Sequence, residues 1–346
     1  MKRLPSLDYL RGLAALGIMV FHYSMWVFGF FTAADFLGRV GIYGVSIFYV
    51  LSGLTLYHVY YNKIKPPYKP GMADFAIKRI FRIFPLLWLV TIITILLKPG
   101  IFPLNNIILN ITGLFGLVCW NDTISYGAWS IGNELVFYLF FPLFIILSQK
   151  SKILFFVLSV IILLIYLWFA FVKIDSTKTL AEYFNDYTNP LNQLFLFLGG
   201  YLIGYLLKDI SVKRNLSLFA LLICLLAFIL IPAKGDSIML ITGFNRVYFT
   251  FICLTVCFLF YKTDFQLPRL AHRALQTLGE ISYALYLIHP VIWHIVATVI
   301  HKYAVTINKW VNLGICFTIS LLTAYIIYRF YERAFMKAGS RVAEKK

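Results

Sequence analysis

Apolar runs long enough to cross a lipid bilayer recur along the whole chain. A membrane-spanning helix needs about 20 consecutive apolar residues. Ten such runs can be counted, at residues 9–30, 40–61, 80–97, 128–148, 152–173, 189–207, 215–232, 245–262, 278–301 and 309–332. Of the 346 residues, 61% are hydrophobic and 13% charged, whereas a soluble domain carries about 25% charged residues. The predicted fold is an all-α polytopic membrane protein with about ten transmembrane helices.

The basic residues predict the orientation of these helices. The net charge is +17, which in a soluble protein would suggest nucleic acid, but here the placement of the charge matters more. A cytoplasmic N-terminus puts most of the 31 Lys and Arg residues inside, as the positive-inside rule requires. Both termini are then cytoplasmic, with a single transmembrane domain over residues 1–333 and a short basic tail over 334–346. The first run lacks a small-residue cleavage site and is expected to remain as an anchor.

Residues 101–120 break the pattern. This stretch contains three Asn and two Gly, and its apolar runs are short. If it crossed the membrane, every later loop would change sides and the charge bias would fall. We therefore expect a re-entrant or interfacial segment on the outer face.

Two ionisable residues interrupt the first apolar run, Arg11 near its start and His22 past its middle. They lie about three helical turns apart on one face. Ionisable groups inside a spanning helix are costly, face the bundle interior or a water-filled cavity, and are functional candidates. The alternative is a hydrogen-bonded structural histidine.

Lys78, Arg79 and Arg82 crowd the cytoplasmic entry of the third run. Arg79 and Arg82 are three residues apart and project together from a helix. Basic residues flank many inner helix ends, so topology alone is one explanation. The other is a clamp for an anion, because arginine binds phosphate with two parallel hydrogen bonds. A nucleotide-bearing cofactor such as coenzyme A would suit it.

The fourth run begins with Trp129 and Ser130, and Glu134 follows on the same helix face as Ser130. Its depth is similar to that of His22. A buried carboxylate needs a partner and a histidine needs a group that fixes its tautomer. We expect a His22–Glu134 pair or a pair between Glu134 and an arginine, the alternative being a purely structural ion pair.

The ninth run carries a polar stripe of Ser282, Tyr286 and His289 at helical spacing. Pro290 follows and is expected to kink the helix and free backbone carbonyls. At the inner end of the last run, Glu332 is expected to form a local salt bridge with its flanking arginines.

Other features predict packing. The five cysteines lie mostly in apolar runs, without the Cys and His spacing of a zinc site, so no metal is expected. The second run contains three glycines that allow close helix approach, at Gly41, Gly44 and Gly53.

Five stretches of the sequence together resemble the membrane-bound acyltransferase family 3, which includes bacterial O-acetyltransferases that act on O-antigen and other surface sugars. They are LDYLRGLAALGIMVFH, GVSIFYVLSG, the pair Arg79 and Arg82, WSIGNE, and LGEISYALYLIHP, in this order between residues 7 and 290. Three positions depart from the family pattern. Ser46 often corresponds to Asp, Tyr49 to Phe, and the residue after Glu332 to Pro.

The resemblance implies transfer of an acyl group, usually acetyl, from cytoplasmic acyl-CoA to a hydroxyl at the outer face of a bacterial inner membrane. It implies that His22 is catalytic, as general base or acyl relay, with Arg11, and that Glu134 matches the family's acidic residue. Arg79 and Arg82, with Lys78, would bind acetyl-CoA. We assign Ser130, Trp129, Ser282, Tyr286 and His289 to substrate binding. The acceptor would be a carbohydrate, and the absence of an appended hydrolase-like domain slightly favours a small or lipid-linked sugar.

Two other functions fit the same residues. A transporter or exporter could use intramembrane His and Glu as a proton relay, although the internal hydropathy symmetry typical of that class is not seen. A non-catalytic assembly partner in envelope synthesis would keep its function without His22.

Overall fold

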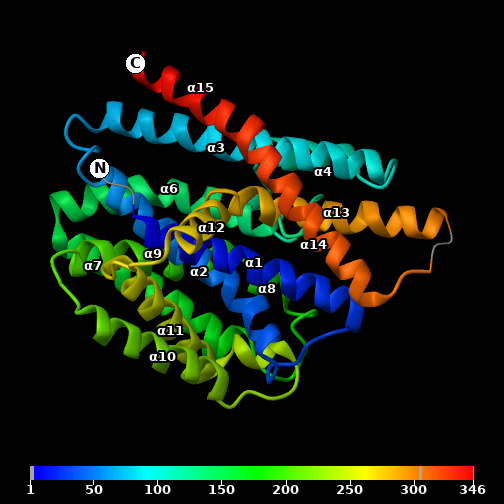
Figure 1. The fold of residues 1–346 in the computed structure, drawn as a ribbon. Coiled ribbons are helices and arrows are strands. Elements are labelled where there is room, and N and C mark those ends of the chain that lie inside the picture. The colour runs from blue at the N-terminus through cyan, green and yellow to red at the C-terminus, as the bar shows by residue number, and fades with distance from the viewer. Residues whose placement is uncertain (1–3, 304–305, 346) are drawn as a thin grey trace.

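The computed structural model describes residues 4–303 and 306–345. Within these residues the protein is built of helices (Figure 1), and nine of them are long and apolar enough to cross a membrane. The predicted spans correspond to α1 (Pro5–Phe28), α2 (Phe36–Tyr60), α3 (Tyr68–Leu97), α6 (Trp129–Lys150), α7 (Lys152–Trp168) with η1 (Phe169–Lys173), α8 (Phe184–Tyr187) with α9 (Pro190–Leu207), α10 (Arg214–Leu230), α11 (Gly243–Lys262), α13 (Ser282–Lys302), and α14 (Lys309–Ile326) with η3 (Ile327–Glu332). The predicted all-α polytopic fold is confirmed. The short helix α10 is the tenth apolar segment.

The stretch 101–120 forms two short helices, α4 (Leu104–Thr112) and α5 (Phe115–Val118), separated at Gly113. Helices of nine and four residues are too short to cross a bilayer, since a crossing takes about 20 residues. Their lengths agree with the prediction that this stretch does not span.

Two helices were not predicted. Residues 278–280, assigned to the ninth span, belong instead to the amphipathic helix α12 (Arg269–Glu280), and α13 begins only at Ser282. The expected polar tail is also helical, because α15 (Arg333–Glu344) continues from η3 and packs against α3. Gly339 faces Phe81 so closely that an added Cβ would lie 2.6 Å from the Phe81 Cβ. A short 3-10 helix, η2 (Ser237–Leu240), precedes α11.

Glycines set the closest helix contact, between α2 and α9. A Cβ at Gly53 would lie 2.0 Å from the carbonyl oxygen of Phe197, and one at Gly200 would lie 1.9 Å from that of Val50. The packing role predicted for the glycines of the second span is confirmed, since Gly41 also faces Phe21 closely. Small residues of this kind let backbones approach in membrane proteins.

The order of the helices brings one end of the bundle together. The end of α2 and the start of α3 are joined by the short segment 61–67, and the end of α15 lies at the same end of the bundle as the start of α1 (Figure 1). Lys63 lies in this connecting segment, and Lys78 and Arg79 lie in the first half of α3. Residues of α1, α2, α3 and α15 also line a cavity.

Candidate active site

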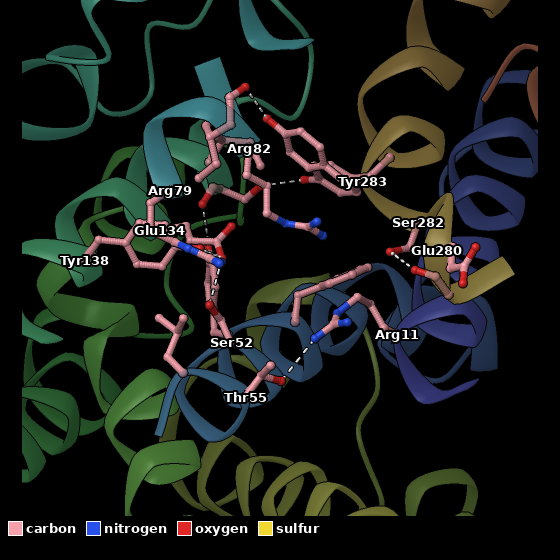
Figure 2. Close-up of a pocket in the computed structure, with 18 of the residues that line it drawn as sticks. Arg11, Ser52, Thr55, Arg79, Arg82, Glu134, Tyr138, Glu280, Ser282 and Tyr283 are labelled. Carbon is pink, nitrogen blue, oxygen red and sulfur yellow. Dashed lines mark hydrogen bonds between the residues drawn. The ribbon is translucent and has the colours of Figure 1, made fainter. Parts of the chain in front are cut away.

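A cavity of about 430 Å³ lies between α1, α2, α3, α6, α12, α13 and the η3–α15 segment. Figure 2 shows charged side chains from different helices converging on it. Its walls include most of the residues singled out in the sequence, namely Arg11, Lys78, Arg79, Arg82, Ser130, Glu134, Ser282 and Tyr286. Residues scattered over most of the sequence therefore form one site.

The arginine pair of α3 faces this cavity. The Arg79 guanidinium lies 5.9 Å from the ring centres of both Tyr60 and Tyr138, and its Nε is buried without a hydrogen-bond partner. Arg82 makes a long contact of 3.5 Å to the sulfur of Met336 in α15. Lys78 is paired with Asp74 at 2.5 Å. The weak contact of Arg82 therefore leaves N–H groups available to an anion in the cavity, whereas the Nε of Arg79 is too buried to reach one.

Arg11 reaches the cavity from α1. Its guanidinium donates to Asp8 and to Thr55, each at 3.1 Å. The contact with Asp8 is a salt bridge within one helical turn. Asp8 and Thr55 therefore hold the Arg11 side chain against α2, toward the cavity.

Glu134 is hydrogen-bonded to two hydroxyl groups and not to His22. Ser52 donates to its carboxylate at 2.7 Å and Tyr138 donates at 2.5 Å. The expected His22–Glu134 pair is wrong, because the carboxylate accepts from Ser52 on α2 (Figure 2), and His22 contacts a different residue. The carboxylate instead lies among the cationic side chains that line the cavity.

His22 pairs with His289. The Nδ1 of His22 lies 2.9 Å from the Nε2 of His289, and the two rings are stacked with centres 5.2 Å apart. The other ring nitrogen of His289, Nδ1, lies 2.9 Å from the carbonyl oxygen of Leu285. A carbonyl only accepts, so Nδ1 of His289 carries the hydrogen and its Nε2 accepts from His22 when both rings are neutral. The His22 Nε2 then keeps a free lone pair.

Aromatic and hydroxyl groups fix the histidine pair. Tyr23 donates to the carbonyl oxygen of His289 at 2.9 Å and lies 2.5 Å from the Ser320 hydroxyl. On its other side His22 stacks on Trp26, with ring centres 5.4 Å apart, and meets Tyr126 edge-on at 5.3 Å. Tyr126 is 52% exposed, so the pair is approachable from that side.

Neither histidine lines the cavity, although both were predicted in the site. Tyr286 lies between, because it lines the cavity and its ring centre is 6.2 Å from that of His289. Ser130 lines the cavity and bonds to Tyr286 at 2.8 Å. Trp129 does not reach it and packs on Tyr187 instead. Its predicted substrate contact therefore has no geometric support.

Several cavity residues were missed in the sequence. Tyr138 stands four residues after Glu134, the spacing at which helical side chains meet, and this signal could have identified it. Ser52 and Thr55 can be identified as cavity residues only from the packing of α2. Met336 and Ser340 come from α15, which the sequence analysis treated as a tail although its apolar residues have helical spacing.

The salt bridge predicted for Glu332 is wrong. Glu332 is 3% exposed, and both of its carboxylate oxygens are buried without a hydrogen-bond partner. It ends the π-helical segment η3, whose wider turns rotate Glu332 away from the positions that an α-helix would give it. Within residues 4–303 and 306–345, no group of three His, Cys, Asp or Glu side chains is placed to hold a metal ion.

Known proteins resemble this chain over nearly its whole length. O-acetyltransferase OatA of Staphylococcus aureus strain NCTC 8325 / PS 47 is 26% identical over 375 residues, covering 97% of this chain. A protein of S. aureus strain COL that is named as an O-acetyltransferase, SACOL0978, is 24% identical over 380 residues, covering 98%. The chain spans 58% of the length of each relative. No solved structure matches it.

The profile of the acyltransferase 3 family, described as an acyltransferase domain, matches residues 4–329. The match includes every helix that contributes to the cavity and the histidine pair except α15. This chain is therefore a membrane acyltransferase of the acyltransferase 3 family.

Proposed function

We propose that the protein transfers an acetyl group from acyl-CoA in the cytoplasm to a hydroxyl of a cell-envelope carbohydrate. The observation that carries this proposal is the position of a histidine pair next to a cavity with four cationic side chains, from Arg11, Lys78, Arg79 and Arg82. The names of its relatives support O-acetyl transfer. Its membership of an acyltransferase family leaves the transporter and the non-catalytic partner without a supporting observation.

The donor would enter the cavity. Coenzyme A carries a pyrophosphate and a 3′-phosphate, and guanidinium groups bind phosphate through charge-assisted hydrogen bonds. Arg79 and Arg82 both line the cavity, and the weak contact of Arg82 leaves N–H donors for these oxygens. A volume of about 430 Å³ falls within the usual range of ligand sites, and the cavity would hold the pantetheine arm with the nucleotide at its mouth. The mouth would be cytoplasmic, as would both chain termini, given the positive-inside rule.

His22 would act as general base. Its Nε2 takes the proton of the acceptor hydroxyl, and the alcohol oxygen attacks the thioester carbonyl carbon. The C–S bond then breaks, an ester forms, and the proton on His22 passes to the departing thiolate to give free coenzyme A. His289 would hold His22 in the reactive tautomer by accepting from its Nδ1.

A covalent route uses the same atoms. The His22 Nε2 attacks the thioester carbonyl carbon, the C–S bond breaks and coenzyme A leaves as its thiolate. The acceptor hydroxyl then attacks the acyl-imidazole carbon, the C–N bond breaks to release the ester, and the hydroxyl proton passes to the thiolate to give free coenzyme A. In this route His289 would stabilise positive charge on the ring by accepting from Nδ1.

Two other roles follow from the geometry. Glu134 would balance the charge of the arginines when no donor is bound, because it shares their cavity without contacting His22. The acceptor would approach past Tyr126, the exposed neighbour of His22. An O-antigen unit or another lipid-linked sugar in a bacterial inner membrane would suit this approach.

The test is label transfer by the purified protein from radiolabelled acetyl-CoA to lipid-linked envelope sugars, with coenzyme A release measured in parallel. Release that depends on a sugar acceptor, together with label in that sugar, is the expected result. If the purified protein neither binds nor consumes acetyl-CoA, the donor assignment is overturned.

A further inference from the structure

Tyr286 lies between the cavity and the histidine pair. Tyr286 lines the cavity, while its ring centre is 6.2 Å from that of His289. His22 and His289 are absent from the cavity walls. A thioester bound in the cavity therefore does not reach the His22 ring while Tyr286 keeps this position.

Hydrogen bonds fix Tyr286 there. Its hydroxyl donates to the carbonyl oxygen of Gly127 at 3.0 Å and lies 2.8 Å from the Ser130 hydroxyl. Ser130 also donates to Gly127, at 3.0 Å. The phenol is 7% exposed, and breaking buried hydrogen bonds costs about 1–3 kcal/mol per unsatisfied group. Tyr286 is thus held by a specific set of bonds to the start of α6.

The turn that receives these bonds contacts both Tyr286 and His22. Gly127 has φ of +79°, a conformation that favours glycine, and a Cβ there would lie 3.2 Å from the Tyr286 hydroxyl oxygen. The preceding residue, Tyr126, meets the His22 ring at 5.3 Å. One turn therefore places Tyr126 against His22 and anchors Tyr286 with the Gly127 carbonyl.

We propose that Tyr286 is a partition between the donor cavity and the histidine pair, held closed by Gly127 and Ser130, and that it must swing aside before an acyl group reaches His22. The proposal rests on the proposed function for the identity of the donor. Tyr286 is a positioning residue in this scheme, not a substrate-binding one. Its closed position keeps water on the histidine side away from the thioester, which favours transfer over hydrolysis.

The partition can be tested without any activity. A cysteine at position 22 (His22→Cys) would be probed with a charged, membrane-impermeant methanethiosulfonate added to one side of sealed membrane vesicles. The background carries Cys119→Ser, because Cys119 is partly exposed and the other four native cysteines are buried. Ser340→Cys, in the cavity wall, identifies the vesicle orientation that exposes the cavity.

From the cavity side, His22→Cys should react slowly in the parent. Adding Tyr286→Ala should raise the rate tenfold or more, and Tyr286→Phe, which keeps the ring and removes the bonds, should raise it severalfold. Tyr283→Phe is the matched control, because its hydroxyl donates to the carbonyl oxygen of Ile83, and it should leave the rate unchanged. Equal rates in all four proteins, or fast labelling in the parent, would overturn the partition.

A second measurement uses milder substitutions, in case Tyr286→Ala does not fold. Acetyl-CoA hydrolysis without acceptor should rise severalfold in Tyr286→Phe and in Ser130→Ala, and unchanged hydrolysis in an enzyme active toward acetyl-CoA would contradict the proposal. If labelling responds to Tyr286 while acetyl-CoA neither binds nor is hydrolysed, the partition stands and the donor assignment fails.

Discussion

The Nδ1 of His22 lies 2.9 Å from the Nε2 of His289, although the two residues are 267 positions apart in the chain. The contact joins α1 to α13 and directs the remaining nitrogen of His22 away from the pair. Because the Leu285 carbonyl fixes the hydrogen on His289, the tautomers of both neutral rings follow from one backbone atom.

His289 should support catalysis through His22. His289→Ala leaves the His22 Nδ1 hydrogen without an acceptor, so kcat should fall about ten- to hundredfold with little change in KM for acetyl-CoA. His289→Gln, whose amide oxygen can accept from His22, should recover part of the loss. A pH profile of kcat that keeps its shape in His289→Ala would argue for a merely structural role.

Arg79 and Arg82 should bind the donor. Each Arg→Ala change should weaken coenzyme A binding about tenfold, since a charge-assisted hydrogen bond contributes about 1.5–3 kcal/mol and these side chains are partly exposed. Titration calorimetry on the purified protein measures the affinity. Arg214→Ala is the control, because Arg214 is exposed and donates to Gln266 outside the cavity.

Comparing coenzyme A with 3′-dephospho-coenzyme A refines this prediction. If the arginine pair holds the 3′-phosphate, the preference for coenzyme A should shrink in the variants. Equal affinities of parent and variants for both ligands would refute the clamp.

Glu134 should influence binding more than chemistry. Glu134→Gln keeps the shape and removes a negative charge from the cavity, so coenzyme A should bind about two- to fivefold more tightly. Because Ser52 and Tyr138 hold the carboxylate and His22 does not contact it, kcat should fall less than about tenfold. A loss as large as that of His22→Ala would restore a catalytic role to Glu134.

The contact between α2 and α9 should tolerate no side chain. Gly200→Ala forces a Cβ to within 1.9 Å of the Val50 carbonyl oxygen, and overpacking costs about 1–3 kcal/mol. A lower apparent melting temperature in detergent is expected. Gly314→Ala is the control, with nothing within 4 Å of the added atom, and an equal shift in both variants would contradict the packing argument.

The sequence predicted the spans well because apolar length is a local property. It also placed Arg11, Arg79, Arg82 and Glu134 in one site, although only packing shows that they share a cavity. The side chains that contact each of these residues were harder to predict. Depth along two helices made His22 and Glu134 look adjacent, but depth does not fix rotation about the helix axis, and rotation turns His22 toward His289 instead. The helix α15 was missed because its low mean hydropathy concealed its amphipathic pattern.

The central claim is that His22 carries the transfer. The direct measurement is the rate of acetyl transfer from radiolabelled acetyl-CoA by purified protein, with His22→Ala compared with His294→Ala, a histidine of the same helix as His289 that lies outside the cavity and the pair. We expect His22→Ala to lose transfer by about 100-fold or more while binding coenzyme A normally, and His294→Ala to stay near the parent rate. Transfer by His22→Ala at the parent rate would contradict the account.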